Sequence, residues 1–345
     1  MKKAILSFDY ELFFGVECGT VDECLVSQTR KILDALRAVG GCAVFFVDYL
    51  MLKRMREECE ETFTEAKKIE EQLKEIVRSG SRIELHLHPH WVDAKYKGNG
   101  KWDFSDYRHY CLQSLPKDKV VEMFKKGAEY LNCIAQQVDQ NYHVCAFRAG
   151  GWAVMPFGHL EDGFIAAGIR VDSSVCSRMT LNGVNYQMNF SDSPECNSYR
   201  FSHDVLVPDV KGQFIEVPIS SFEHNPFSYV LNRLDHKFNR RKYLHYAVGT
   251  YMSNGRKTIY KPLPWRQRLH KRSIFGIDVL NKIVLLLRLI WTKRSFVVFI
   301  GHPKDLNDVA LDNIAFLGKY MQFTTYDALI DNKELKGVCS VRGED

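Results

Sequence analysis

Residues 82–91 read RIELHLHPHW, and this stretch decides how the rest of the chain is interpreted. Its first six residues have the short apolar pattern of a buried strand. His86, His88 and His90 then follow at every second position. In parallel α/β folds functional groups gather at the carboxyl ends of the strands. The histidines are therefore either an exposed run or side chains held around a common ligand.

The remainder of the chain alternates between short apolar runs and amphipathic segments. This alternation over 345 residues predicts a parallel α/β fold, either a barrel or an open doubly wound sheet. No Gly-x-Gly-x-x-Gly follows the first strand, which argues against a dinucleotide-binding fold. Strands are predicted at residues 3–12, 42–48, 82–87, 143–149, 169–175 and 295–302, an edge pair at 204–210 and 213–220, and helices at 22–40, 49–78, 116–138, 158–168 and 308–321.

The composition is that of a globular protein, with 46% hydrophobic and 26% charged residues. The 10 cysteines are scattered and include no Cys-x-x-Cys pair, which indicates reduced thiols and a cytoplasmic protein. Asp9 and Glu11 interrupt the first apolar run before it reaches the length of a signal peptide. No uncharged apolar stretch reaches the ~18 residues of a membrane-spanning helix.

The positive charge is concentrated in one part of the chain. Residues 232–295 contain 16 Lys and Arg against two Asp, although the whole chain has a net charge of only +5. We expect a basic amphipathic insertion at about residues 225–295. Its apolar helix either packs in the core or, with residues 255–294, rests on anionic lipid at the inner face of the membrane. No nucleic-acid-binding motif accompanies the cations, so no nucleic acid partner is expected.

Several strand-end residues could carry chemistry. Asp9 and Glu11 are two apart in an extended segment, so both carboxylates can face one cavity, or both can be surface acids. Glu11, His86 and His90 together offer the carboxylate and two imidazoles of a catalytic metal site. His88 alternates in phase with the other histidines, and we assign it to the substrate wall.

Two further residues follow apolar strands. Arg148 stands beside two glycines, and if it is buried it needs a carboxylate partner, which Asp9 or Asp172 could supply. The alternative is a solvated arginine. His302 ends the apolar run SFVVFIG and is either held in the core or placed at the mouth of a site.

In this order the motifs SFDYE, HLHPH, FRAGGW, VDSS and FIGH resemble those of the polysaccharide deacetylase family, also called carbohydrate esterase family 4 or the NodB homology domain. The resemblance extends from about residue 5 to residue 303. It implies a distorted (β/α)7 barrel, similar to a TIM barrel with one unit missing. We therefore expect one catalytic domain over residues 1–345, with insertions.

The resemblance also implies roles for the residues. Asp9 would be the general base, positioned by Arg148, and His302 the general acid, with Asp172 tuning the acid side. Glu11, His86 and His90 would bind a divalent metal, with zinc expected first and cobalt, nickel or manganese as alternatives. The chain departs from the family pattern where Ala149 and Gly150 stand in place of a proline and where the fourth motif lacks its tryptophan. These departures concern the substrate groove, to whose wall His88, Trp91 and Trp152 are assigned.

The predicted function is therefore that of a hydrolase that acts on a carbon–nitrogen bond. It would remove an N-acyl group, normally N-acetyl, from a sugar or glycan, and a lipid-linked glycan intermediate is a candidate substrate. Two alternatives stay open at this point. One is a carbohydrate-binding barrel without metal or activity, and the other is a metal-dependent amidase or deformylase that acts on a non-polysaccharide substrate.

Overall fold

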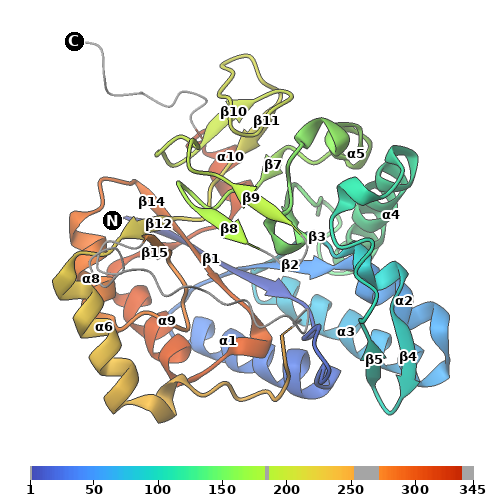
Figure 1. Ribbon diagram of the computed structural model, residues 1–345, viewed down its shortest axis with the longest axis horizontal. Helices are drawn as coiled ribbons and strands as arrows, with labels where there is room; N and C mark the ends of the chain where they lie inside the picture. The colour runs from blue at the N-terminus through green and yellow to red at the C-terminus, as the bar shows by residue number, and fades with distance from the viewer. Residues whose placement is uncertain (1, 183–185, 252–271, 336–345) are drawn as a thin grey trace.

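The structure, a computed structural model, describes residues 2–182, 186–251 and 272–335 (Figure 1). Its centre is a 9-stranded sheet with the order β10-β11-β7-β6-β3-β2-β1-β14, and β15 pairs with the start of β1. All neighbours along this order are parallel except β10 and β11. The strands are β1 (Lys3–Tyr10), β2 (Val44–Asp48), β3 (Arg82–Leu87), β6 (Ala146–Ala149), β7 (Val171–Asp172), β10 (Tyr199–Phe201), β11 (Phe214–Glu216), β14 (Phe296–Gly301) and β15 (Gln322–Phe323).

The sheet curls until its two ends meet. Beyond β11, the backbone N–H of Ser220 donates to the carbonyl of Val298 in β14 (3.2 Å). The N–H of Val298 in turn donates to the hydroxyl of Ser220 (3.0 Å). These bonds join the far end of the sheet to the strand beside β1. The parallel strands therefore form a distorted barrel, as predicted, rather than an open sheet.

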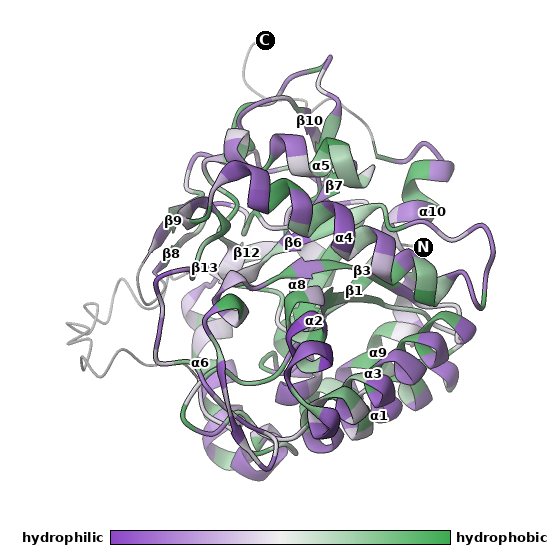
Figure 2. Cartoon of the chain, turned by 90° about the vertical axis from the view of Figure 1, so that its right-hand side faces the viewer, coloured by the Kyte–Doolittle hydropathy of each residue, from purple (hydrophilic) through white to green (hydrophobic). Residues whose placement is uncertain are grey.

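Helices cover the outside of the barrel, and α1, α3 and α9 pack below β1 and β2 (Figure 1). Their outer faces are hydrophilic and their inner faces hydrophobic (Figure 2). The helix predicted over residues 49–78 is in fact two helices, because Cys59 is extended with a φ of −162°. The bounds are η1 (Asp22–Val26), α1 (Ser27–Arg37), α2 (Tyr49–Glu58), α3 (Glu60–Arg78), α4 (Lys117–Ala135), α5 (Glu161–Ala167), α9 (Asp308–Tyr320) and α10 (Tyr326–Asp331).

Alternate residues of β1 belong to different environments. Leu6 and Phe8 join the large apolar cluster that contains the helices, whereas Ile5 joins a second cluster with side chains from the other strands and from α10. The second cluster therefore fills the amino-terminal part of the barrel interior. On the same face of β1, Ser7 and Asp9 follow Ile5, because side chains two apart in a strand share a face. The interior thus changes from apolar to polar toward the carboxyl ends of the strands.

Short elements connect the strands. They are the hairpins β4 (Lys95–Gly98) with β5 (Lys101–Asp103) and β8 (Thr180–Asn182) with β9 (Gln187–Asn189), the pair β12 (Ser221–Glu223) with β13 (Arg272–Ile274), the 3-10 turns η2 (Pro89–Val92), η3 (Leu112–Ser114), η4 (Gly150–Trp152), η5 (Phe157–His159), η6 (Arg240–Tyr243) and η7 (Pro303–Asp305), and the helices α6 (Pro226–Phe238) and α8 (Lys282–Trp291). Residues 204–210 were predicted to pair with 213–220, but β10 is the antiparallel partner of β11. Of the basic segment predicted at 255–294, residues 255–271 lie outside the described residues.

One tyrosine completes the hydrogen bonding of β3. Ile83 in β3 lies before the point at which β6 begins to pair, since that pairing starts at Leu85. The hydroxyl of Tyr142 donates to the carbonyl of Ile83 and accepts from its N–H, both at 2.7 Å. Tyr142 therefore takes the place of a neighbouring strand.

We predict that Tyr142→Phe leaves two buried backbone groups of Ile83 without a partner. The free energy of unfolding, measured by urea titration, should fall by about 1–3 kcal/mol. Tyr320→Phe is the matched control because Tyr320 is exposed, and it should change that free energy by less than about 0.5 kcal/mol. Equal stability of the two variants would contradict this account.

Candidate active site

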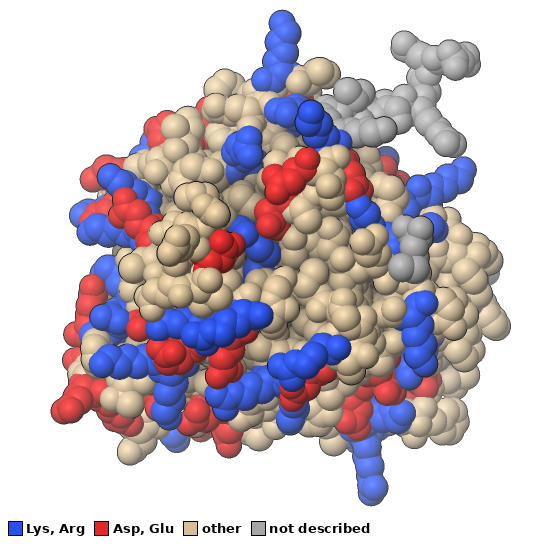
Figure 3. All heavy atoms as spheres, turned by 180° about the vertical axis from the view of Figure 1, so that it is seen from behind, with Lys and Arg blue, Asp and Glu red and all other residues tan. Residues whose placement is uncertain are grey.

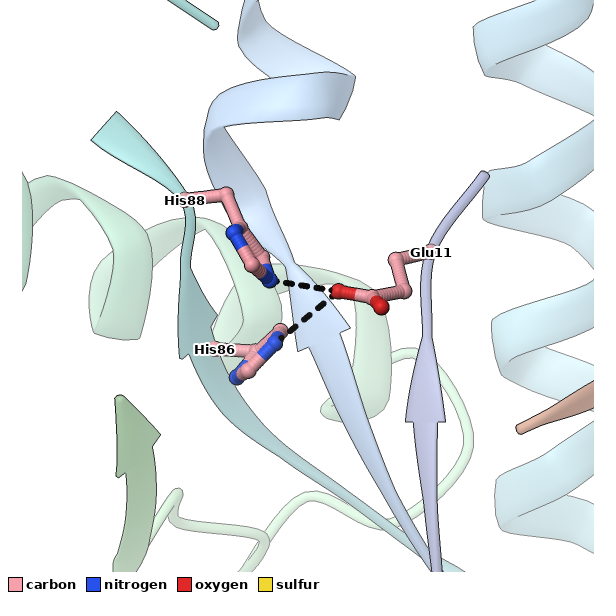
Figure 4. Close-up of side chains that lie close together, drawn as sticks. All are labelled: Glu11, His86 and His88. Carbon is pink, nitrogen blue, oxygen red and sulfur yellow. Dashed lines mark hydrogen bonds and ion pairs between the residues drawn. The ribbon is translucent and has the colours of Figure 1, made fainter. Parts of the chain in front are cut away.

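Three donor groups meet at the carboxyl ends of β1 and β3. Glu11 follows β1, His86 lies in β3 and His88 comes directly after it, and all three are buried. Glu11 Oε2 lies 3.2 Å from His86 Nε2 and 2.6 Å from His88 Nε2 (Figure 4). One ligand atom from each residue lies within 4.8 Å of the others. Among the described residues, this is the group of three with metal-ligand spacing.

Neighbouring backbone groups orient both imidazoles. His86 Nδ1 donates to the carbonyl of Arg148 (2.6 Å), which directs His86 Nε2 toward Glu11. The backbone N–H of His88 donates to Asp48 Oδ1 (3.2 Å), and the same carboxylate accepts from the first turn of α2. Burial raises the pKa of Asp48 to about 6, although the nearby histidines act in the opposite direction.

His90 lies outside this cluster, although the sequence analysis assigned it as a ligand. Its ring is buried, stacks on Tyr110 (5.8 Å between centroids) and meets the ring of Phe14 edge-on (4.4 Å). Neither ring nitrogen has a hydrogen-bond partner in the described part of the chain. Burial, followed by the positive charge of His88, lowers the pKa of His90 well below its usual value.

The local backbone explains why His88 and not His90 joins Glu11. His88 is still extended (φ −109°, ψ 95°), so its side chain has the same orientation as that of His86. Pro89 then begins the 3-10 turn η2, which ends the alternation. His90 is therefore turned into the aromatic cluster.

A lysine also contacts the carboxylate. Lys304 Nζ lies 2.8 Å from Glu11 Oε1 and 2.9 Å from the carbonyl of Leu12, and Lys304 is only 1% exposed. Burial alone would raise the pKa of Glu11. The charges of Lys304 and His88 and the hydrogen bonds from both histidines lower it well below its usual value. The carboxylate is therefore ionised, with one oxygen toward the imidazoles and the other toward the ammonium.

Arg148 and Asp9 form an ion pair beside this cluster. Arg148 is fully buried, and its Nη1 lies 2.5 Å from Asp9 Oδ1. Its other nitrogens donate to the hydroxyl of Ser7 (2.8 Å) and the carbonyl of Ser173 (2.9 Å), and the guanidinium lies over the ring of Phe46. The carboxylate partner that the sequence analysis required for a buried arginine is therefore Asp9.

His302 approaches the same carboxylates from the end of β14. Its Nε2 lies 3.7 Å from Asp9 Oδ2 and 3.8 Å from Glu11 Oε1. Its Nδ1 lies 3.1 Å from Asp305 Oδ2. Burial lowers the pKa of His302, but the hydrogen bond and charge of Asp305 raise it to about 8. The side chain of His302 is 22% exposed, against 7% or less for Asp9 and Glu11, so it faces the mouth of the barrel.

Asp172 was expected to act on the acid side of the site, with His302, but its hydrogen-bond partners are Ser174 and Glu216. Its Oδ1 accepts from the hydroxyl of Ser174 (2.7 Å), and its carboxyl group is hydrogen-bonded to Glu216. Burial and the adjacent charge of Asp172 raise the pKa of Glu216 well above its usual value, so Glu216 holds the proton that the pair shares. In the described residues Asp305, and not Asp172, is the carboxylate that contacts His302 Nδ1.

The two tryptophans assigned to the substrate wall lie in different surroundings. Trp91 is 1% exposed and packs against Trp102 and Phe104, so it belongs to the core. Trp152 follows β6 in η4, is partly exposed and has a φ of 60°, directly after Gly151 with a φ of 59°. A role for either in substrate binding stays a prediction.

Four residues of the site were missed by sequence reasoning. Asp48 and Glu216 each end an apolar strand, so the rule that found Asp9 and His302 would also have found them. Lys304 and Asp305 lie in the turn η7 beyond β14, and their surroundings depend on how that turn folds back over β1. No spacing in the sequence shows this.

The donor set fits a divalent metal. Two imidazole nitrogens and one carboxylate oxygen are the usual protein ligands of a catalytic zinc or a similar ion. Glu11 Oε2 already faces both imidazoles. His86 has the carbonyl acceptor that commonly orients a metal-binding histidine. Lys304 occupies the other oxygen of Glu11, so this carboxylate would bind the metal through Oε2.

No protein-family model and no curated protein matches the sequence. A search of solved structures finds 24 similar chains. One, a Mycobacterium smegmatis protein assigned as a polysaccharide deacetylase, has a TM-score of 0.46 and 14% identity, covering 100% of this chain and 96% of that chain. Peptidoglycan deacetylase PdaC from Bacillus subtilis has a TM-score of 0.38 and 13% identity, with 96% and 92% covered. A family 4 carbohydrate esterase from Streptomyces lividans has a TM-score of 0.38 and 9% identity, with 98% and 91% covered.

A pair of matched variants distinguishes His88 from His90 as the metal ligand. We predict that His88→Leu lowers zinc affinity by more than about tenfold, the loss seen even for outer-shell partners. His90→Leu should retain zinc affinity and stability, because leucine suits the aromatic surroundings of His90. Zinc binding is measured by competition with a chromophoric chelator, and folding by circular dichroism. Loss of zinc in His90→Leu alone would restore the ligand set predicted from the sequence.

Proposed function

We propose that the protein is a metal-dependent hydrolase that removes an N-acyl group, normally N-acetyl, from a sugar or glycan. The observation that supports this most is the placement of His302 within 4 Å of both Asp9 and Glu11, beside the donor group of Glu11, His86 and His88. Hydrolysis of an amide needs an electrophilic site, a proton acceptor and a proton donor within reach of one bond. Asp9 and His302 would supply the proton acceptor and the proton donor, and a divalent ion held by Glu11, His86 and His88 would supply the electrophilic site.

Glu11, His86 and His88 would hold the divalent ion. When bound, such an ion lowers the pKa of water and polarises the carbonyl oxygen of the amide. We propose zinc, with cobalt, nickel and manganese as alternatives. Asp48 supports this group through the backbone N–H of His88, and Arg148 through its carbonyl on His86.

Asp9 and His302 would transfer the protons. The ion pair of Asp9 Oδ1 with Arg148 directs the other oxygen of this carboxylate, Oδ2, toward His302. Asp9 then accepts a proton from the attacking water. The imidazolium form of His302, stabilised by Asp305, donates a proton to the leaving amine, which is otherwise a poor leaving group.

We further propose a glycan substrate carried on a lipid and a cytoplasmic location. The location is supported by the free thiols of the nine cysteines among the described residues. The lipid carrier is supported by the apolar side chains and the cations that α6 and α8 expose. Acetate release from N-acetylhexosamine substrates separates this proposal from a metal-dependent amidase or deformylase that acts on a non-polysaccharide substrate.

One observation favours a second candidate, a barrel that binds carbohydrate without metal or activity. Lys304 places a buried ammonium group on Glu11 and thereby supplies a positive charge at the proposed metal site. A carboxylate neutralised in this way needs no metal to be stable. This candidate predicts a protein that binds sugar, retains no metal and releases no acetate.

We predict that His302→Gln lowers the rate of acetate release from N-acetylglucosamine oligomers by about 10²–10⁴-fold, the usual contribution of general acid catalysis. Zinc content should not change, because His302 is not among the donor atoms. Asp9→Asn should lower the rate similarly but also destabilise the protein, because it leaves the charge of Arg148 buried without a carboxylate. Wild-type acetate release by a folded His302→Gln variant would refute the assigned role.

Metal dependence has its own test. We expect the purified protein to contain about one zinc or similar ion per chain, measured by mass spectrometry after dialysis. A chelator should abolish acetate release, and zinc or cobalt should restore it. Full retention of activity in the chelated, metal-free protein would contradict the proposal. Sugar binding with neither metal nor activity would support the second candidate.

A further inference from the structure

Two adjacent helices within residues 225–295, α6 and α8, expose apolar side chains along one face. In α6, Phe227, Val230, Leu234 and Phe238 recur at helical spacing and are 63%, 45%, 43% and 75% exposed. In α8, Ile283, Leu286, Ile290 and Trp291 are 56%, 38%, 62% and 63% exposed. Eight large apolar side chains on two helices are more than the scattered exposure of an ordinary surface. We call them the α6–α8 face.

The two helices form one surface. Arg288 in α8 donates to the hydroxyl of Ser228 in α6 (2.6 Å). Asn232 in α6 accepts from the backbone N–H of Asn281, the residue that caps α8 (3.0 Å), and His236 is hydrogen-bonded to the carbonyl of Val279 (2.9 Å). The opposite side of α8, with Val284, Leu285 and Leu289, is buried in the apolar core. Both helices lie at the same end of the molecule (Figure 1).

Cations border the apolar side chains. Arg233 and Lys237 are exposed on α6, and Arg240 and Arg241 follow it in η6. Lys293 is exposed just after α8. Within the described residues, no carboxylate forms an ion pair with any of these five, whereas on the face shown in Figure 3 acidic and basic side chains are interspersed. The one acid of α6, Asp235, is hydrogen-bonded to Tyr243 and Asn239.

We propose that the α6–α8 face binds an anionic lipid surface. An exposed apolar stripe with unpaired cations at its border is the pattern of a helix that lies in the interface of a membrane. Its apolar side chains enter the acyl boundary, while arginine and lysine contact anionic headgroups. Among the described residues, no helix is both long and apolar enough to cross a bilayer. The contact is therefore peripheral.

The face continues toward the mouth of the barrel. After η6, Leu244, Val248 and Tyr251 are 57%, 75% and 55% exposed. The backbone of this segment is hydrogen-bonded to the loops beyond β1 and β14, from Gly15 N–H to Thr250 (2.8 Å) and from Tyr246 N–H to Leu306 (2.9 Å). The hydroxyl of Tyr251 donates to Asp305, the partner of His302. If the proposed function holds, the lipid surface therefore lies next to the site that receives the glycan.

Sedimentation with sucrose-loaded vesicles tests the lipid proposal without any activity measurement. The full chain should bind vesicles of phosphatidylcholine with 30% phosphatidylglycerol and should bind pure phosphatidylcholine much more weakly. Raising the salt concentration should weaken binding to the anionic vesicles, because exposed charges are screened. Failure of the wild-type chain to sediment with anionic vesicles would overturn the proposal.

Matched variants distinguish lipid binding by the α6–α8 face from non-specific binding through exposed apolar side chains elsewhere. Phe238→Ser combined with Ile290→Ser changes one exposed residue on each helix and should lower the partition coefficient at least tenfold. Ile165→Ser combined with Val210→Ser removes similarly exposed side chains elsewhere, 56% and 68% exposed, and should leave binding unchanged. Arg233→Gln with Lys237→Gln should reduce binding to anionic vesicles only.

Two further results would overturn the proposal. One is equal partitioning of the Phe238→Ser, Ile290→Ser variant and the wild type. The other is a wild-type dimer in sedimentation velocity, without lipid, that the same variant abolishes, because the face would then bind a second copy of the chain. None of these outcomes depends on acetate release, so they leave the hydrolase proposal to its own tests.

Discussion

The structure depends on the buried ion pair between Arg148 and Asp9. A guanidinium in the barrel interior is tolerated only when its charge and its donors are satisfied, and removing one partner of such a pair typically costs about 3–5 kcal/mol. Arg148 satisfies this condition by reaching from β6 to Asp9 and Ser7 on β1 and to Ser173 beyond β7. Through its own carbonyl it also orients His86. One side chain therefore fixes strand positions and the direction of the groups between them.

The charged groups of the site, including this ion pair, lie in pairs of opposite sign. Arg148 faces Asp9, Lys304 faces Glu11, and Asp305 faces His302. Each of these three carboxylates thus has a cationic neighbour, which lowers the cost of holding several acids in a small volume. The same arrangement leaves Asp9 Oδ2 and His302 Nε2 directed toward each other. The proposed mechanism uses these two groups as the proton acceptor and the proton donor at one bond.

The barrel and the helices α6 and α8 differ in where they place their apolar side chains. The barrel buries its apolar side chains on both sides of the strands, and its helices are hydrophilic only outside (Figure 2). In contrast, α6 and α8 are joined to each other by polar contacts and expose apolar side chains, although Val284, Leu285 and Leu289 of α8 are buried in the apolar core. Such an exposure is unfavourable in water, because apolar surface is stabilised by burial. A lipid surface would remove it from water.

Much of the fold follows from local pattern. The strands and their carboxyl-terminal polar residues were predictable, because a period of two places Asp9 and Glu11 on one face and apolar runs mark the buried strands. Local pattern did not predict closure of the barrel, which only the resemblance of the motifs implied, since closure rests on Ser220 and Val298, 78 residues apart in sequence. The exchange of His90 for His88 in the donor group was also not predictable, because it follows from the turn that begins at Pro89. By itself the sequence determined which residues stand at the strand ends. Only the tertiary structure decided which of them meet, because contacts such as that of Lys304 with Glu11 join segments that no local spacing relates.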